Sequence, residues 1–164
     1  MSDSSPKSLT FEVSAETSAS PEQVIEIAGK DFSARRAEIW PNVRKTHFVV
    51  HDQGTDYAEV TEGGTGPARF IWERCRYDWS RPGVVTSTVI DSNALLPGTT
   101  FELRAVPSDG GGSIVEMVLD RKFRPAGWGR VGYALNRIFG RRGFEFMLRQ
   151  ALKSVEKQAA LTPD

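Results

Sequence analysis

The feature that most constrains the fold is the apolar C-terminal stretch that runs from Pro125 to Leu161. Near its end, apolar side chains recur at steps of three and four residues, the period of one helix face. These residues are Phe144, Leu148, Ala151, Leu152, Val155 and Ala159. A single helix cannot bury such a face by itself, so the sequence predicts a long helix lying against a sheet.

The same stretch contains a shorter apolar stripe of Val131, Leu135 and Ile138, which we expect to behave in the same way. Gly140 and Gly143 separate the two stripes and predict a kink, since glycine weakens a helix interior. The kink lets the helix bend around the sheet or, alternatively, acts as a hinge that opens a cavity. Basic residues off the stripes form a solvated face or a patch for anionic lipid headgroups. They are Arg130, Arg137, Arg141, Arg149, Lys153 and Lys157.

The chain before this stretch is typical of strands and turns. Ser20, Pro21 and Gln23 form a helix-start pattern, and a second short helix is expected over residues 31–39. Apolar runs separated by turn residues predict strands at 9–17, 44–52, 57–62, 68–79, 84–92, 99–106 and 113–124. The sequence therefore predicts an α+β fold, with a curved antiparallel sheet of about seven strands around a long C-terminal helix.

Length and charge set limits on the class of protein. A chain of 164 residues forms one domain, which we place at residues 9–161, after a disordered tail at residues 1–8. Its 21 basic and 21 acidic residues balance, which argues against nucleic acid as a partner. There is no apolar run long enough to span a bilayer, and the polar N-terminus lacks a signal-peptide core.

Cysteine and histidine content bears on compartment and metal binding. The single cysteine, Cys75, cannot form an internal disulfide, so we expect a cytoplasmic location. His47 and His51 have no cysteine or histidine partner at metal-ligand spacing, so neither a metal nor another cofactor is expected.

Four short motifs, in this order, carry a resemblance to a known superfamily. They are Ser20-Pro21-Glu22-Gln23-Val24 after the first strand, Trp40-Pro41-Asn42-Val43, the Glu73-containing strand before Arg81-Pro82, and Phe123-Arg124-Pro125 before the last helix. The chain resembles the START and polyketide cyclase-like superfamily, which has the helix-grip fold of the birch-pollen allergens. The resemblance implies a cavity between sheet and helix that holds a lipid, polyketide or similar molecule. It implies no catalytic residue.

Alternation along each predicted strand indicates which side chains face that cavity. Most are apolar, and we assign as ligand-binding Phe48, Ile71, Phe101, Leu103, Met117, Leu119, Phe123 and, from the helix, Leu148. Three polar residues, Glu73, Tyr77 and Arg121, share this inner face. Buried charges need partners, so Glu73 and Arg121 either anchor the polar end of an amphipathic ligand or form a structural ion pair.

Three kinds of function remain open at this point. The first is a carrier or sensor of a small hydrophobic ligand, working as a monomer or homodimer. The second is a polyketide aromatase/cyclase-type enzyme, in which Glu73, Tyr77 and Arg121 would supply base, donor and charge clamp. A one-residue slip that turned His47 inward would favour this enzyme. The third is a protein-interaction module, which requires an exposed apolar patch in place of a cavity.

Overall fold

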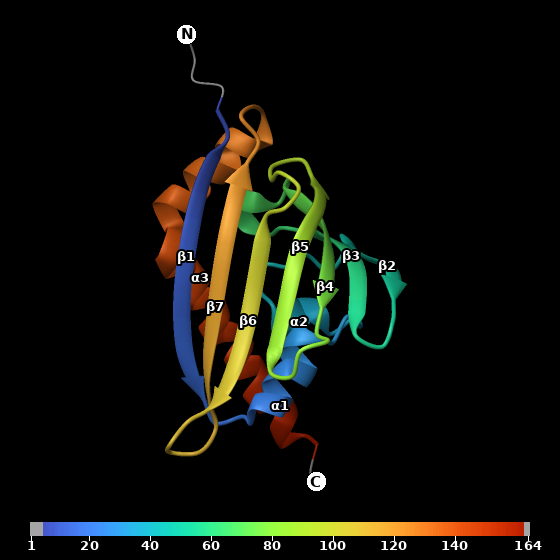
Figure 1. The fold of residues 1–164 in the computed structure, drawn as a ribbon, viewed down its shortest axis with the longest axis vertical. Helices are drawn as coiled ribbons and strands as arrows, with labels where there is room; N and C mark the ends of the chain where they lie inside the picture. Colours follow the sequence, from blue (N-terminus) through green and yellow to red (C-terminus); the bar gives the residue numbers. More distant parts are fainter. Residues whose placement is uncertain (1–4, 163–164) are drawn as a thin grey trace.

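The computed structural model describes residues 5–162, and these form a seven-stranded antiparallel sheet curved around one long helix (Figure 1). The strands are β1 (Lys7–Thr17), β2 (Phe48–Gln53), β3 (Tyr57–Gly63), β4 (Trp72–Asp78), β5 (Val84–Ser92), β6 (Thr100–Pro107) and β7 (Ser113–Phe123). Their order in the sheet is β1-β7-β6-β5-β4-β3-β2. The predicted α+β helix-grip architecture is therefore confirmed.

Strand boundaries differ from the prediction where turn residues intervene. The strand expected over residues 68–79 is shorter, because a 3₁₀ turn, η2 (Gly66–Ala68), precedes it and β4 begins at Trp72. The strand expected over 44–52 likewise begins only at Phe48. The predicted tail at residues 1–8 extends too far, because Lys7 and Ser8 already pair with β7. Residues 1–4 of that tail lie outside the described residues.

Two short helices connect β1 to β2. Helix α1 (Pro21–Val24) starts as predicted, with Ser20 as N-cap, Pro21 at the first position and a capping box between Ser20 and Gln23. It continues into a π-helical turn, η1 (Ile25–Gly29). Helix α2 (Arg36–Ile39) covers only the end of the helix predicted at residues 31–39. In Figure 1 these elements lie in the lower half of the view, near the lower parts of β5 and β6.

Helix α3 (Trp128–Ala160) lies behind the sheet in Figure 1, and the predicted kink is present at Gly140 (φ 26°, ψ −124°). We call residues 128–139 its N-terminal segment and residues 141–160 its C-terminal segment. In the C-terminal segment the predicted stripe is confirmed, since Leu148, Ala151, Leu152 and Val155 are buried.

The stripe predicted in the N-terminal segment is wrong as a core-facing stripe at two of its three positions, since only Leu135 is half-buried. Val131 and Ile138 are 39% and 73% exposed, and the buried positions are Gly129 and Gly132. The physical reason is a close approach between backbone segments. A Cβ atom at position 129 would stand 2.0 Å from the carbonyl oxygen of Arg124, so only glycine fits there. This segment thus packs through its glycines, with Tyr133 and Leu135 half-buried beside them. Its exposed large side chains are Trp128, Val131, Ile138 and Phe139.

The main core lies between the sheet and the C-terminal segment of α3. Fully buried side chains from both layers meet there, among them Leu103, Met117, Val115, Leu148 and Val155. Within the described residues, no helix has the length and apolar character needed to cross a membrane.

Candidate functional site

A cavity of about 350 Å³ lies on the concave side of the sheet, between the strands, α2 and the part of α3 on both sides of its kink. Its sheet wall includes Tyr77, Ser87, Phe101, Met117 and Leu119. Its helix wall includes Leu135, Asn136, Phe139, Phe144 and Met147. The lining is mainly apolar with a few polar groups, which is typical of sites for small ligands.

Most of the residues assigned to ligand binding from the sequence line this cavity. They are Glu73, Tyr77, Arg121, Ile71, Phe101, Met117, Leu119 and Phe123. Three assigned residues do not line it, because alternation identifies a face but not a position along that face. Leu103 and Leu148 are 1% and 0% exposed and fill the core, while Phe48 is half-buried on β2.

A buried ion pair, which sequence reasoning missed, stands at the α2 end of the cavity. The Arg36 guanidinium donates from Nε to Glu62 Oε1 (3.0 Å) and from Nη1 to the carbonyl oxygen of Ala28 (2.8 Å). Tyr77 donates its hydroxyl to the other oxygen of Glu62 (2.9 Å). Trp40 also donates to Ala28 through its indole nitrogen (2.8 Å). All four side chains are thus held by protein partners.

The protonation of this cluster follows from its surroundings. Burial lowers the pKa of the Arg36 guanidinium, but the charges and hydrogen bonds of Glu62 and Tyr77 together outweigh that effect, and the net shift of the pKa is upward. Burial, with the nearby charge of Glu62, raises the pKa of Tyr77 well above its usual value. Arg36 therefore stays charged and Tyr77 stays protonated, so the tyrosine acts as a hydrogen-bond donor.

A second ion pair stands nearer the middle of the cavity. Arg121 on β7 donates from Nη2 to Glu73 Oε1 on β4 (3.2 Å), and its guanidinium lies 5.6 Å from the ring centroid of Phe144. The pair is partly buried, with the Arg121 side chain 15% exposed. Nε of Arg121 is buried without a partner, and so is Oδ1 of Asn136 on α3. Two polar atoms in the wall, one donor and one acceptor, are thus unsatisfied.

The sheet register brings the two glutamates together. Glu62 on β3 is directly opposite Glu73 on β4, and residues in such positions share one face of the sheet. Two like charges placed opposite each other are destabilising. Each carboxylate is matched by an arginine from a different element, Arg36 from α2 and Arg121 from β7. No sequence signal shows this arrangement, because it depends on a pairing of strands.

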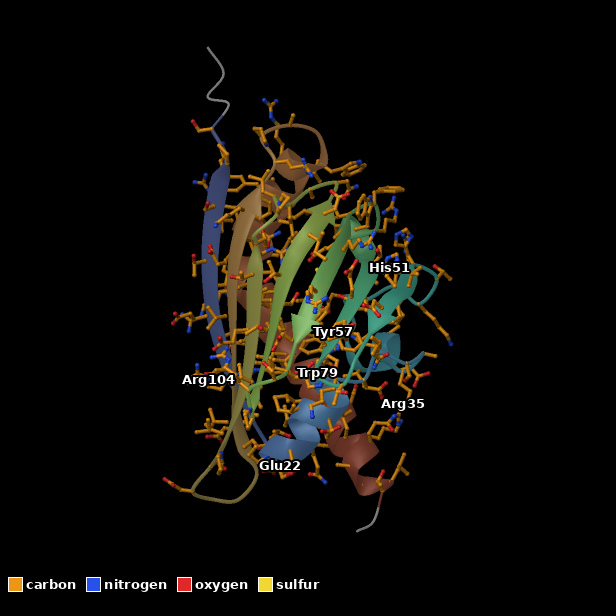
Figure 2. The ribbon with its side chains drawn as sticks, turned by 45° about the vertical axis from the view of Figure 1, so that its right-hand side comes forward. Glu22, Arg35, His51, Tyr57, Trp79 and Arg104 are labelled. Atoms are coloured by element: carbon orange, nitrogen blue, oxygen red, sulfur yellow. The ribbon has the colours of Figure 1, made fainter. Side chains whose placement is uncertain are left out.

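Histidine and cysteine contribute little to the cavity. His51 lies on the outer side of the β2 edge, labelled in Figure 2, where its ring nitrogen bonds Thr61 Oγ1 (2.7 Å). His47 is not part of the cavity lining. Burial, then the charges of Glu73 and Glu62, raises the pKa of the Cys75 thiol well above its usual value, which fits an apolar filler. Over residues 5–162 there is no cluster of three or more potential metal ligands.

The cavity reaches the surface beside the N-terminal segment of α3. Asn42, Pro67 and Phe139 each line the cavity and are also exposed. We call the opening between η2 and α3, defined by these three residues, the mouth. Phe139 is 57% exposed, so an apolar ring stands at the edge between cavity and solvent.

Comparison with known proteins places this architecture among solved structures. No family model matches the sequence. No curated protein matches it either. The structure is similar to TTHA0849 from Thermus thermophilus, with a TM-score of 0.74 and 14% identity over 94% of this chain and 100% of that one.

Two further solved structures share the architecture. One is Zhui aromatase/cyclase from Streptomyces sp. R1128, with a TM-score of 0.67 and 17% identity over 94% of this chain and 96% of that one. The other is a START superfamily protein from Mycobacterium smegmatis, with a TM-score of 0.65 and 12% identity over 93% and 99% of the two chains. At these identities the likeness shows the fold, and the predicted resemblance to START and polyketide cyclase-like proteins is confirmed at that level.

Proposed function

We propose that this helix-grip protein binds a small apolar or amphipathic molecule in the cavity between its sheet and α3, as a carrier or sensor. The cavity itself carries the proposal, because its volume of about 350 Å³ and its mainly apolar wall suit such a ligand. Proteins with this fold include a START superfamily protein, which is consistent with ligand binding.

The unsatisfied atoms of Arg121 and Asn136 indicate the ligand's polar group. A buried donor without a partner is costly, and a ligand oxygen that accepted from Arg121 Nε would remove that cost. A hydroxyl or carboxylic acid group can also donate to Asn136 Oδ1. The expected ligand therefore combines an apolar body with an oxygen-bearing group. The role predicted for Arg121 becomes part of this proposal, with Glu73 as its protein partner.

An aromatase/cyclase is the second candidate, and the structural likeness to Zhui aromatase/cyclase is the observation in its favour. The cavity wall supports it less well. A one-residue shift in strand register would have turned His47 inward as a possible base, but His47 is not part of the cavity lining. Tyr77 and Glu62 are engaged with each other, and Tyr77 is held protonated. These groups are arranged for structure and binding more than for proton transfer.

The test combines identification of a bound molecule with a matched pair of variants. The purified protein is weighed by native mass spectrometry, and any bound molecule is extracted and identified. Anilinonaphthalene sulfonate, an apolar anion, is then titrated against the wild type and Arg121→Met. We expect binding to weaken about tenfold in Arg121→Met, because one charge-assisted contact is lost.

Arg104→Met is the control, because Arg104 is an exposed arginine on β6, labelled in Figure 2, and is not part of the cavity lining. Its affinity should equal that of the wild type. An absence of any co-purified molecule together with equal dye affinity in all three proteins would contradict the proposal. Turnover of a polyketide substrate by the wild type would favour the enzyme instead.

A further inference from the structure

The surface around the mouth is rich in exposed apolar side chains. Five large apolar side chains there are 39–73% exposed: Phe70, Trp128, Val131, Ile138 and Phe139. We call these five residues the mouth surface. Phe70 lies outside α3 and contacts the four helical residues through Trp128, with the two ring centroids 5.4 Å apart. Contiguous exposed apolar surface of this kind marks an interaction site.

The helical part of the mouth surface occupies one side of α3. At about 100° per residue, Trp128, Val131, Ile138 and Phe139 fall within an arc of about 100°. The buried side of this segment is occupied by Gly129 and Gly132. The apolar arc borders this buried side, because Leu135 falls within the arc and lines the cavity together with Phe139. The four side chains of the arc are nevertheless 39–73% exposed, and no described part of the chain covers them fully.

The charge around the mouth surface has one sign. Every charged residue in segments 63–72 and 121–144 is basic, in a chain whose net charge is zero. They are Arg69, Arg121, Lys122, Arg124, Arg130, Arg137, Arg141 and Arg142. Apart from Arg121 and Arg124, none of these is in an ion pair within residues 5–162.

The basic side chains come from the same segments as the apolar residues. Arg69 lies over the Phe70 ring, with its guanidinium 4.6 Å from the ring centroid. Arg130 and Arg137 belong to the same helical segment as Trp128 and Ile138, and Arg141 follows the kink. All four arginines are exposed. Long arginine side chains can extend past an apolar face to reach a charged layer above it.

We propose that the mouth surface docks on a membrane that contains anionic lipids. An aromatic and aliphatic face with exposed arginines beside it matches an interface whose outer layer is anionic and whose inner layer is apolar. Phe139 belongs both to this surface and to the cavity wall, so docking would bring the mouth against the bilayer. The inference goes beyond ligand binding in the cavity, since none of these four exposed arginines lines that cavity.

The experiment is co-sedimentation with vesicles of phosphatidylcholine, with and without about 30% phosphatidylglycerol. We expect the wild type to bind the anionic vesicles and to lose binding as salt rises, because added ions screen the arginines. Ile138→Ser should bind about tenfold more weakly, since one apolar anchor is lost. Arg137→Gln combined with Arg141→Gln should weaken binding by about fivefold for each arginine.

Matched controls come from the C-terminal segment of the same helix. Phe146 is 60% exposed there, and Lys153 and Lys157 are exposed. Phe146→Ser, and Lys153→Gln combined with Lys157→Gln, should bind vesicles like the wild type. Arg104→Met should do so too, because Arg104 is an exposed arginine on β6 that lies outside both the mouth surface and the cavity lining. Circular dichroism melting checks that every variant is folded.

Three results would overturn the proposal. The first is no binding of the wild type to anionic vesicles. The second is an equal loss in the mouth-surface variants and in the controls. The third is a dimer, seen by sedimentation equilibrium, that Ile138→Ser dissociates without any vesicle binding by the wild type, because the surface would then join two copies of the chain.

Discussion

The two segments of α3 belong to one helix but pack against the sheet in different ways. The C-terminal segment turns Leu148, Leu152 and Val155 into the core, each no more than 3% exposed. The N-terminal segment buries glycines and exposes Ile138 to 73%. The first segment follows the ordinary rule for an amphipathic helix on a sheet. The second departs from it beside the cavity.

The difference shows where stability and function are separated. A segment that packs through glycines buries little side-chain area, so it adds little to the free energy of folding. It leaves space on the concave side of the sheet, and that space is the cavity. Gly140 is the boundary, and the ring of Phe11 on β1 lies against it. The comparison predicts that changes in the two segments will have unequal effects.

The largest expected effect is loss of a core leucine from the C-terminal segment. Leu148→Ala removes a side chain with no exposed area and should lower the free energy of unfolding by about 3 kcal/mol. Ile138→Ala in the N-terminal segment should change it by less than about 0.5 kcal/mol. Urea denaturation of both variants measures this, and equal destabilisation would refute the division between the segments.

A smaller effect is expected at the kink. Gly140→Ala forces an alanine to adopt positive φ and places its Cβ 3.0 Å from Phe11 Cε1, so it should cost about 2 kcal/mol. Gly143→Ala is the matched control, because the site is helical and its nearest contact would be an ordinary 3.5 Å. That variant should stabilise by up to about 1 kcal/mol. Similar melting curves for both would mean that the kink is not strained.

The smallest effect concerns pH. Glu156, in the C-terminal segment, accepts hydrogen bonds from the Ser18 amide (2.9 Å) and the Thr17 hydroxyl (2.8 Å). These two hydrogen bonds lower the pKa of Glu156 in the folded protein, and the bond from the Ser18 amide has the larger effect. Because the pKa of Glu156 is lowered by folding, the stability that its carboxylate adds is fully present above the pKa of the unfolded state. That stability is lost as the pH falls through the pKa of the folded state.

Stability measured from neutral to acidic pH should therefore fall less steeply in Glu156→Gln than in the wild type. The difference should appear from about pH 5 downward, where the unfolded-state carboxyl begins to bind protons. Urea denaturation at several pH values measures the slope. Parallel curves for the two proteins would show that these hydrogen bonds add no pH-dependent stability.

Local patterns were enough to predict the architecture. The capping box at Ser20 and Gln23 depends only on neighbouring residues, and the inward row of Val115, Met117 and Leu119 follows from strand alternation. The stripe around Leu148 follows from helix periodicity. In each of these cases the signal lies within one element, so sequence alone is sufficient.

The parts that were missed depend on contacts between distant elements. The Arg36–Glu62 pair joins α2 to β3, and the apposition of Glu62 and Glu73 follows from strand register. The apolar pattern of Val131 and Ile138 looks like any packing stripe. Nothing in that pattern shows that Gly129 and Gly132 would take the inner side, because close approach of backbone segments is a tertiary property.

The Arg121–Glu73 pair has a geometric consequence for the ligand. Strands β6 and β5 separate β7 from β4, so the two residues would stand about 14 Å apart on a flat sheet. Their side chains meet at 3.2 Å because the sheet curves and both reach inward. The pair thus crosses the interior, with Ile71 and Phe123 on one side of it and Tyr77 and Met117 on the other.

A molecule that fills the cavity from end to end must therefore pass beside the Arg121–Glu73 pair. Alternatively, its own polar group takes the place of one partner in the pair. The oxygen-bearing group would then sit partway along the ligand, with apolar portions on both sides. A fatty acid with a mid-chain hydroxyl should accordingly displace a bound dye more effectively than its unsubstituted parent, and equal displacement would argue against this placement. The cavity would thus select molecules by where along their length the oxygen is carried.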